Sequence, residues 1–153
     1  MKMEKLDLKR EDFREFLDRL RAEKELVDIQ QPVDIRHIAT LVDQAQTALY
    51  FHNVIGYDMP VVSGIIRTSR RAALSMGCSA FPEIEYKLQQ GIDNPVKPKT
   101  VENARCKEVI EVGQAVDLFR LPIPMSSIYD GGPMITAGVV IAKDPEHGIN
   151  SGM

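Results

Sequence analysis

Several residues of types that can do chemistry lie close together near the carboxyl end of the sequence. His147 precedes Asn150 by three positions, a spacing that suggests a metal site, but both belong to or follow the turn-prone residues 144–148. Residues 130–133 read Asp-Gly-Gly-Pro, which is the composition of a turn and only weakly that of a phosphate loop. Thr136 is β-branched, as strand residues commonly are. Considered alone, these residue types favour structural roles.

Other reactive groups are scattered through the sequence. Cys78 has no paired base near it, so a role as a nucleophile lacks support. With Cys106 as the only other cysteine, the sequence contains neither a disulfide framework nor zinc-knuckle spacing. We therefore predict two reduced thiols in a cytosolic protein. Arg70 and Arg71 can bind phosphate, although a solvated helix face or an interface salt bridge is the more common role of such a pair.

The elements that would position these groups differ between two sections of the chain. In the first ninety residues, apolar spacing and turn residues predict helices over 10–22, 70–76 and 83–90 and strands over 25–29, 49–55 and 61–66. Asp34 is the predicted N-cap of a further helix, with an apolar face of Ile35, Ile38, Ala39, Val42 and Ala45. Helices packed on a small sheet are predicted here.

Residues 92–100 contain two prolines without periodicity and are interpreted as a linker. After them the sequence predicts a strand over 107–112, an extended segment over 121–124 and a buried strand over 135–142. The fold class predicted for the chain is α+β. Its predicted sections are an amino-terminal α/β domain over 1–100 and the opening strands of a β-barrel or sheet over 101–153.

Composition excludes several classes of function. The chain has 153 residues, 44% hydrophobic and 27% charged, which is ordinary for a globular protein. Its net charge of -3 gives no support for a nucleic-acid partner or an anionic membrane surface. No apolar run reaches the length that spans a bilayer, and the first residues lead into a charged helix. A cytoplasmic protein is expected.

An ordered set of motifs resembles the UbiD family of decarboxylases. The family signature runs roughly as "DL…LPIP…DGGPYIT.GVVI.KDPE.G..N.G.YR", and this chain has its counterparts at 117–124, 130–136, 144–145 and 150–153. Residues 13–17, 25–27, 56–62 and 70–71 also resemble the family in the same order. Met134 departs from the signature, since an aromatic residue commonly precedes "IT". Residues 126–127 are serines where many members carry histidine.

The resemblance implies a fold, an activity and cofactors. Family members decarboxylate aromatic or α,β-unsaturated acids, some of them reversibly, with prenylated flavin mononucleotide (prenylated FMN), a divalent metal that is usually Mn²⁺, and K⁺ in some members. Their amino-terminal α/β domain is followed by a split β-barrel similar to flavin reductases and by a carboxy-terminal domain. Members are commonly homo-oligomers. By this resemblance the chain is the amino-terminal domain and the start of the barrel.

The resemblance also implies site residues. Asn150 matches the family's metal-binding asparagine, and an amide oxygen is a hard donor suited to Mn²⁺ or Mg²⁺. Ser151, Gly152 and Met153 match the backbone that passes the cofactor, and Thr136 matches a threonine on the strand facing the flavin. Gly152 would permit a close approach.

The family's other metal ligands and its Glu–Arg–Glu/Asp proton-transfer network would lie after Met153. The chain alone is therefore expected to be inactive and to need the remainder of the enzyme, as a carboxy-terminal part or a companion subunit. Two other interpretations stay open. One is a non-catalytic interaction or regulatory subunit, and the other is a split-barrel flavin-binding oxidoreductase module that needs no metal.

Overall fold

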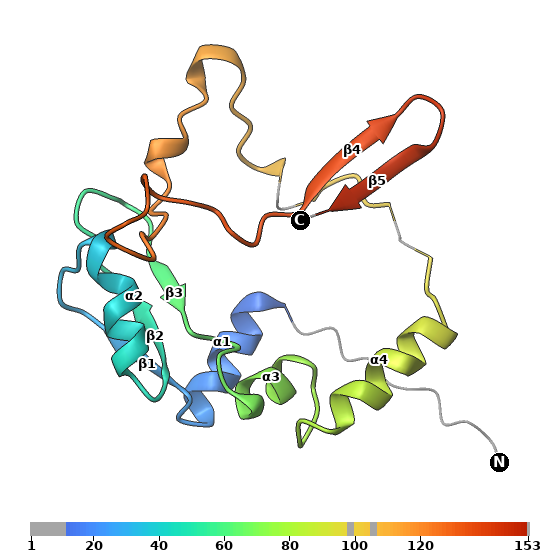
Figure 1. Ribbon diagram of the computed structural model, residues 1–153, viewed down its shortest axis with the longest axis horizontal. Coiled ribbons are helices and arrows are strands. Elements are labelled where there is room, and N and C mark those ends of the chain that lie inside the picture. The colour runs from blue at the N-terminus through green and yellow to red at the C-terminus, as the bar shows by residue number, and fades with distance from the viewer. Residues whose placement is uncertain (1–11, 98–99, 105–106, 153) are drawn as a thin grey trace.

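The computed structural model describes residues 12–97, 100–104 and 107–152. Its elements in chain order are α1 (Phe13–Ala22), β1 (Leu26–Ile29), α2 (Ile35–Gln44), β2 (Ala48–Phe51), β3 (Val61–Ser63), α3 (Ser69–Ser75), α4 (Glu83–Asp93), the 3₁₀ turns η2 (Gly113–Ala115) and η3 (Leu118–Arg120), β4 (Val140–Asp144) and β5 (Gly148–Gly152). Figure 1 shows them along the chain. The mixed α+β composition confirms the predicted class in its coarse form.

The first section is built on a three-stranded sheet in the order β1-β2-β3. β1 and β2 are parallel, with Leu26 opposite Ala48, and α2 is the crossover that such a pair requires. β3 returns antiparallel to β2, with Leu49 opposite Ser63. The predicted strands are confirmed, although each is shorter than its apolar run.

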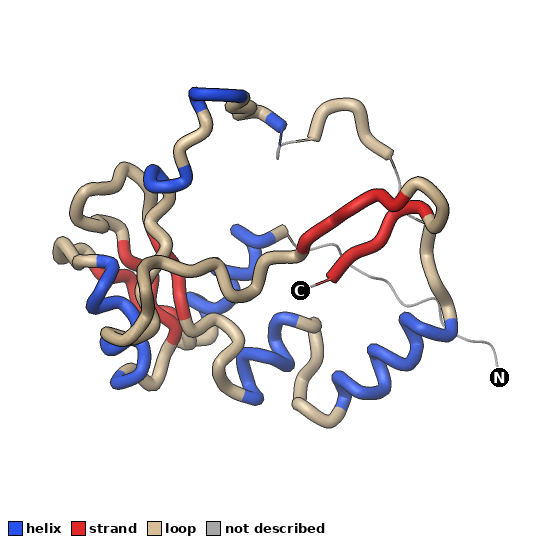
Figure 2. The backbone as a smooth tube through the Cα atoms, turned by 45° about the horizontal axis from the view of Figure 1, so that its top comes forward, coloured by secondary structure: helices blue, strands red, loops and turns tan. Residues whose placement is uncertain are grey.

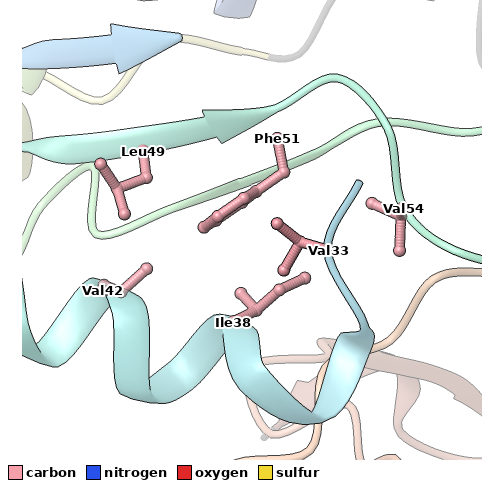
Figure 3. Packing of buried hydrophobic residues seen from close by; sticks show 6 residues of the cluster. All are labelled: Val33, Ile38, Val42, Leu49, Phe51 and Val54. Atoms are coloured by element: carbon pink, nitrogen blue, oxygen red, sulfur yellow. The ribbon is translucent and has the colours of Figure 1, made fainter. Parts of the chain in front are cut away.

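Alternate strand residues point to opposite faces of this sheet. Apolar residues therefore lie on both faces, and helices pack against each of them. On one face, α2 contributes Ile38 and Val42, which point toward Leu49 and Phe51 of β2 in Figure 3. On the other face, Leu26 and Ala48 pack with Phe16, Leu17 and Leu20 of α1, and Leu74 of α3 packs against the same cluster. Neither core cluster includes a residue after Leu74.

Caps define the beginnings of these helices. The Asp12 carboxylate accepts hydrogen bonds from the Arg14 and Glu15 backbone N–H groups, and the Glu15 carboxylate accepts from the Asp12 N–H, which completes a capping box. Asp34 caps α2 through the Arg36 N–H, as predicted. Among the described residues no helix combines the length and the apolar character that crossing a membrane would require.

Three predictions about individual elements were wrong. α4 does not end at residue 90 but continues through Gly91 to Asp93, where the Gln89 side chain donates to the Asp93 carboxylate one turn away. Residues 107–112 do not form a strand, and none of the described strands pairs with them. The predicted buried strand over 135–142 is instead an exposed strand over Val140–Asp144.

The register of the β4–β5 hairpin explains the last difference. Val140 lies opposite Gly152, so residues before Val140 would face residues after Gly152, where the described part of β5 ends. A two-stranded hairpin has no second layer against which to bury a face. In both Figure 1 and Figure 2 the hairpin lies apart from the β1–β3 sheet.

Candidate functional site

The β4–β5 hairpin carries the residues on which the predicted site depends. Its turn was predicted at 144–148, and the structure joins Asp144 to Gly148 through three loop residues. One carboxylate oxygen of Asp144 accepts hydrogen bonds from the Glu146 N–H at 2.8 Å and the His147 N–H at 2.7 Å. Gly148 follows with φ +85°, a conformation that glycine adopts without steric cost.

Asn150 lies opposite Ala142 in this hairpin, and its side chain is exposed. Its amide oxygen accepts a hydrogen bond from the Ser151 N–H at 2.9 Å. A carbonyl oxygen has two lone pairs, so this bond orients the amide and leaves one pair for a cation. Because strand residues alternate, Asn150 and Gly152 are on one face of the hairpin and Ser151 is on the other.

The structure brings Asn150, Ser151 and Gly152 together as consecutive residues of β5. A side chain built on Gly152 would meet no protein atom within 4 Å, so its backbone is open to a bound group. Thr136 is not on a strand as predicted. It lies in a turn before β4, because the described hairpin does not extend that far. Met153 lies outside the described residues.

Among the described residues, the predicted metal ligand is the amide oxygen of Asn150. The described residues contain no group of three or more His, Cys, Asp or Glu side chains placed to hold a metal ion. Asn150 could supply one oxygen donor to a metal ion. The backbone N–H of His147 donates a hydrogen bond to Asp144 within the turn.

A polar cluster on the first section was not predicted. Arg21 of α1 donates two hydrogen bonds to the Asp28 carboxylate at 2.9 and 3.0 Å, and His52 Nε2 lies 2.8 Å from the same carboxylate. The Arg21 guanidinium also lies 5.2 Å from the centre of the Tyr50 ring. These groups come from α1, β1 and the end of β2, and the cluster ties the helix to the sheet.

This cluster predicts a pH dependence of stability. The hydrogen bonds from Arg21 are the main cause that lowers the pKa of Asp28, and His52 adds to them. A carboxylate whose pKa is lower in the folded state stabilises the fold above its unfolded pKa of about 3.9, and this contribution disappears as the pH falls through the folded pKa. Asp28→Asn should therefore flatten the loss of stability below about pH 4, measured by thermal unfolding at a series of pH values. Parallel curves for wild type and variant would contradict it.

Arg71 is buried and bound, not free to hold phosphate. It is 1% exposed, and it donates hydrogen bonds to the Glu25 carboxylate at 3.0 Å, the Gln46 carbonyl at 2.9 Å and the Gly64 carbonyl at 3.0 Å. Arg70 pairs with the same Glu25 carboxylate at 2.8 Å. Of the two roles that the sequence favoured for this pair, a solvated helix face or an interface salt bridge, the structure shows salt bridges, in which both arginines pair with Glu25 of the same chain.

A hollow of about 450 Å³ lies between the start of α2 and the segment around η3. Ile35, Arg36, Tyr57, Phe119 and Pro133 are among the residues that line it. Arg36 is already paired with the Asp34 carboxylate at 2.7 Å. None of the predicted site residues that the structure describes lines this hollow.

Comparison with known families accounts for both sections of the chain. The model of the 3-octaprenyl-4-hydroxybenzoate carboxy-lyase N-terminal domain (UbiD_N) matches residues 17–88, and the model of the Rift-related domain of the same carboxy-lyase (UbiD) matches residues 99–153. The chain belongs to the UbiD family. It corresponds to the amino-terminal part of a UbiD-type decarboxylase.

Individual UbiD proteins also match most of this chain. The chain is 31% identical over 138 residues to the anhydromevalonate phosphate decarboxylase of Methanothermobacter thermautotrophicus, covering 90% of this chain and 31% of the relative. It resembles the UbiD-class enzyme HmfF from Pelotomaculum thermopropionicum, solved in an evolved dimeric form in complex with prenylated FMN. For that structure the TM-score is 0.80 and the identity 35%, covering 90% of this chain and 34% of the enzyme.

The vanillic acid decarboxylase of Sedimentibacter hydroxybenzoicus is also similar. Its structure matches with a TM-score of 0.82 and 30% identity, covering 94% of this chain and 35% of the matched chain. The chain thus spans about a third of the length of the UbiD relatives that it matches.

Proposed function

We propose that this chain is the amino-terminal part of an enzyme that reversibly decarboxylates an aromatic or α,β-unsaturated carboxylic acid with prenylated FMN and a divalent metal. The supporting observation is that both sections match consecutive UbiD domains, with Asn150 exposed on the hairpin of the second section. The names of similar proteins support decarboxylation, and one of them was solved with prenylated FMN.

The domain division that we propose is an amino-terminal α/β domain over 1–100 and the first strands of a split, flavin reductase-like β-barrel over 101–153. Two observations support it. The family matches stop at residue 88 and resume at residue 99. Both core clusters lie in the first section, whereas the strands of the second are exposed.

In this proposal the amide oxygen of Asn150 binds Mn²⁺, with K⁺ as a further ion of the site. The backbone of Ser151, Gly152 and Met153 runs beside the cofactor, and Thr136 contacts it. The metal would balance the charge of the flavin phosphate. The accessible lone pair of Asn150 and the open space at Gly152 support these roles.

Bound prenylated FMN would supply the electron sink for the bond to the departing carbon dioxide. This chain's share is to hold and orient it. The acid that returns a proton to the substrate carbon would come from the remaining part of the enzyme. The chain by itself is therefore proposed to be inactive, and the assembled enzyme to be a cytoplasmic homo-oligomer.

The test is release of carbon dioxide from a panel of aromatic and unsaturated acids by the complete enzyme, with prenylated FMN and Mn²⁺. We expect turnover with at least one acid and none without the cofactor. Flavin binding that is independent of metal, without turnover, would favour the oxidoreductase module. An assembled complex that binds no flavin would favour a non-catalytic subunit.

A further inference from the structure

We propose that Asp144 is a positioning residue that holds Asn150 on the metal-facing side of the β4–β5 hairpin. This inference rests on the metal role proposed for Asn150. It concerns how the fold presents that side chain, and it assigns Asp144 no contact with the metal or the substrate.

The turn between β4 and β5 depends on the Asp144 carboxylate. The three loop residues offer two backbone N–H groups, because Pro145 has none. Both of those groups, from Glu146 and His147, donate to the same oxygen of Asp144. This arrangement closes the loop at three residues, and Gly148 completes the turn with its positive φ.

Loop length sets the register of a hairpin, and the register decides which face each side chain occupies. With Asp144 opposite Gly148, Asn150 lies opposite Ala142. A slip by one residue would place Ile149 where Asn150 now stands and move the amide to the opposite face. The position of the Asn150 oxygen therefore depends on the turn two residues before it.

Little else in the described structure holds this register. Every residue of β4 is exposed, and so is every residue of β5 except the half-buried Gly148. None of the directly opposed pairs brings two large apolar side chains together. Ile141 lies opposite Ser151, Lys143 lies opposite Ile149, and Val140 lies opposite Gly152, which has no side chain. The hydrogen bonds of Asp144, together with the positive φ of Gly148, favour this register.

Asp144 also lies on the same face of the hairpin as Asn150, so a direct electrostatic role for its carboxylate must be separated from positioning. Asp144→Asn keeps an oxygen that can accept both N–H groups but removes the charge. Asp144→Ala removes both the accepting oxygen and the charge. If Asp144 acts by positioning, Asp144→Asn rescues the site and Asp144→Ala does not.

The experiment measures Mn²⁺ affinity of the complete enzyme loaded with prenylated FMN, by titration with detection of free Mn²⁺ in electron paramagnetic resonance. Asp144→Ala should weaken Mn²⁺ binding about 10-fold, in the range found when residues that orient metal ligands are removed. Asp144→Asn should stay within about 2-fold of wild type, since its oxygen can still accept both N–H groups. Gly148→Ala, which strains the same turn without touching the carboxylate, should also weaken binding.

Asp12→Ala is the matched control, because Asp12 likewise accepts two backbone N–H groups but at the start of α1. It should lower the melting temperature and leave Mn²⁺ affinity unchanged. Wild-type affinity in Asp144→Ala, or in Gly148→Ala should Asp144→Ala not fold, would overturn the inference. Equal losses in Asp144→Asn and Asp144→Ala would assign the effect to charge and overturn it too.

Asn150→Ala separates this inference from the proposed function. If Asn150→Ala binds Mn²⁺ normally, the metal role and the positioning role both fail. If Asn150→Ala loses the metal while Asp144→Ala keeps it, only the positioning role fails.

Discussion

Replacing Asn150 with alanine is expected to lower the Mn²⁺ affinity of the complete, cofactor-loaded enzyme by at least about 100-fold. Removing groups that merely orient a metal ligand costs about 10–100-fold, and loss of a direct ligand should reach the upper end of that range or exceed it. In the structure the Asn150 side chain is exposed, and its oxygen makes one hydrogen bond, to the Ser151 N–H. Decarboxylation should fall with metal occupancy and recover partly at high Mn²⁺ concentration.

Asn94→Ala provides the control for this measurement. Asn94 is an exposed asparagine whose side chain donates to the Gln90 carbonyl at the end of α4. It should bind Mn²⁺ as wild type does. Asn150→Asp, which retains an oxygen donor, should keep most of the affinity. Unchanged Mn²⁺ binding in Asn150→Ala would remove the central support for the proposed site.

Glu25→Ala is expected to destabilise the first section by about 3–5 kcal/mol, the usual cost of removing one partner of a buried ion pair. Arg71 is 1% exposed, and its guanidinium would lose the carboxylate that lies 3.0 Å away. The carbonyls of Gln46 and Gly64 would still accept hydrogen bonds from it but could not balance its charge. The urea concentration at the midpoint of unfolding should fall accordingly.

Glu23→Ala is the matched comparison, because Glu23 pairs with Arg70 at 2.7 Å where both side chains are substantially exposed. Exposed pairs contribute about 0–1 kcal/mol, so its midpoint should shift little. Equal shifts for the two variants would mean that burial of Arg71 does not govern the contribution of this network.

The short-range features of the first section could be predicted because their signals are local. The apolar stripe of Phe16, Leu17 and Leu20 and the cap at Asp34 act within a turn or two of the chain. The end of α4 was predicted wrongly because Gly91 costs only about 1 kcal/mol within a helix, and local bonds such as Gln89 to Asp93 oppose that cost. The ordered UbiD motifs were also legible, and the family matches confirm that assignment.

The sequence by itself determined the family, the capped helices and the three strands of the first sheet, since each depends on neighbouring residues or on motif order. Tertiary structure alone decided the burial of Arg71, whose partners Glu25 and Gln46 are 46 and 25 residues away. It also decided that Thr136 lies in a turn and that the last strands are exposed. Strand length and burial depend on the strands and layers that pack alongside, and no local pattern encodes those.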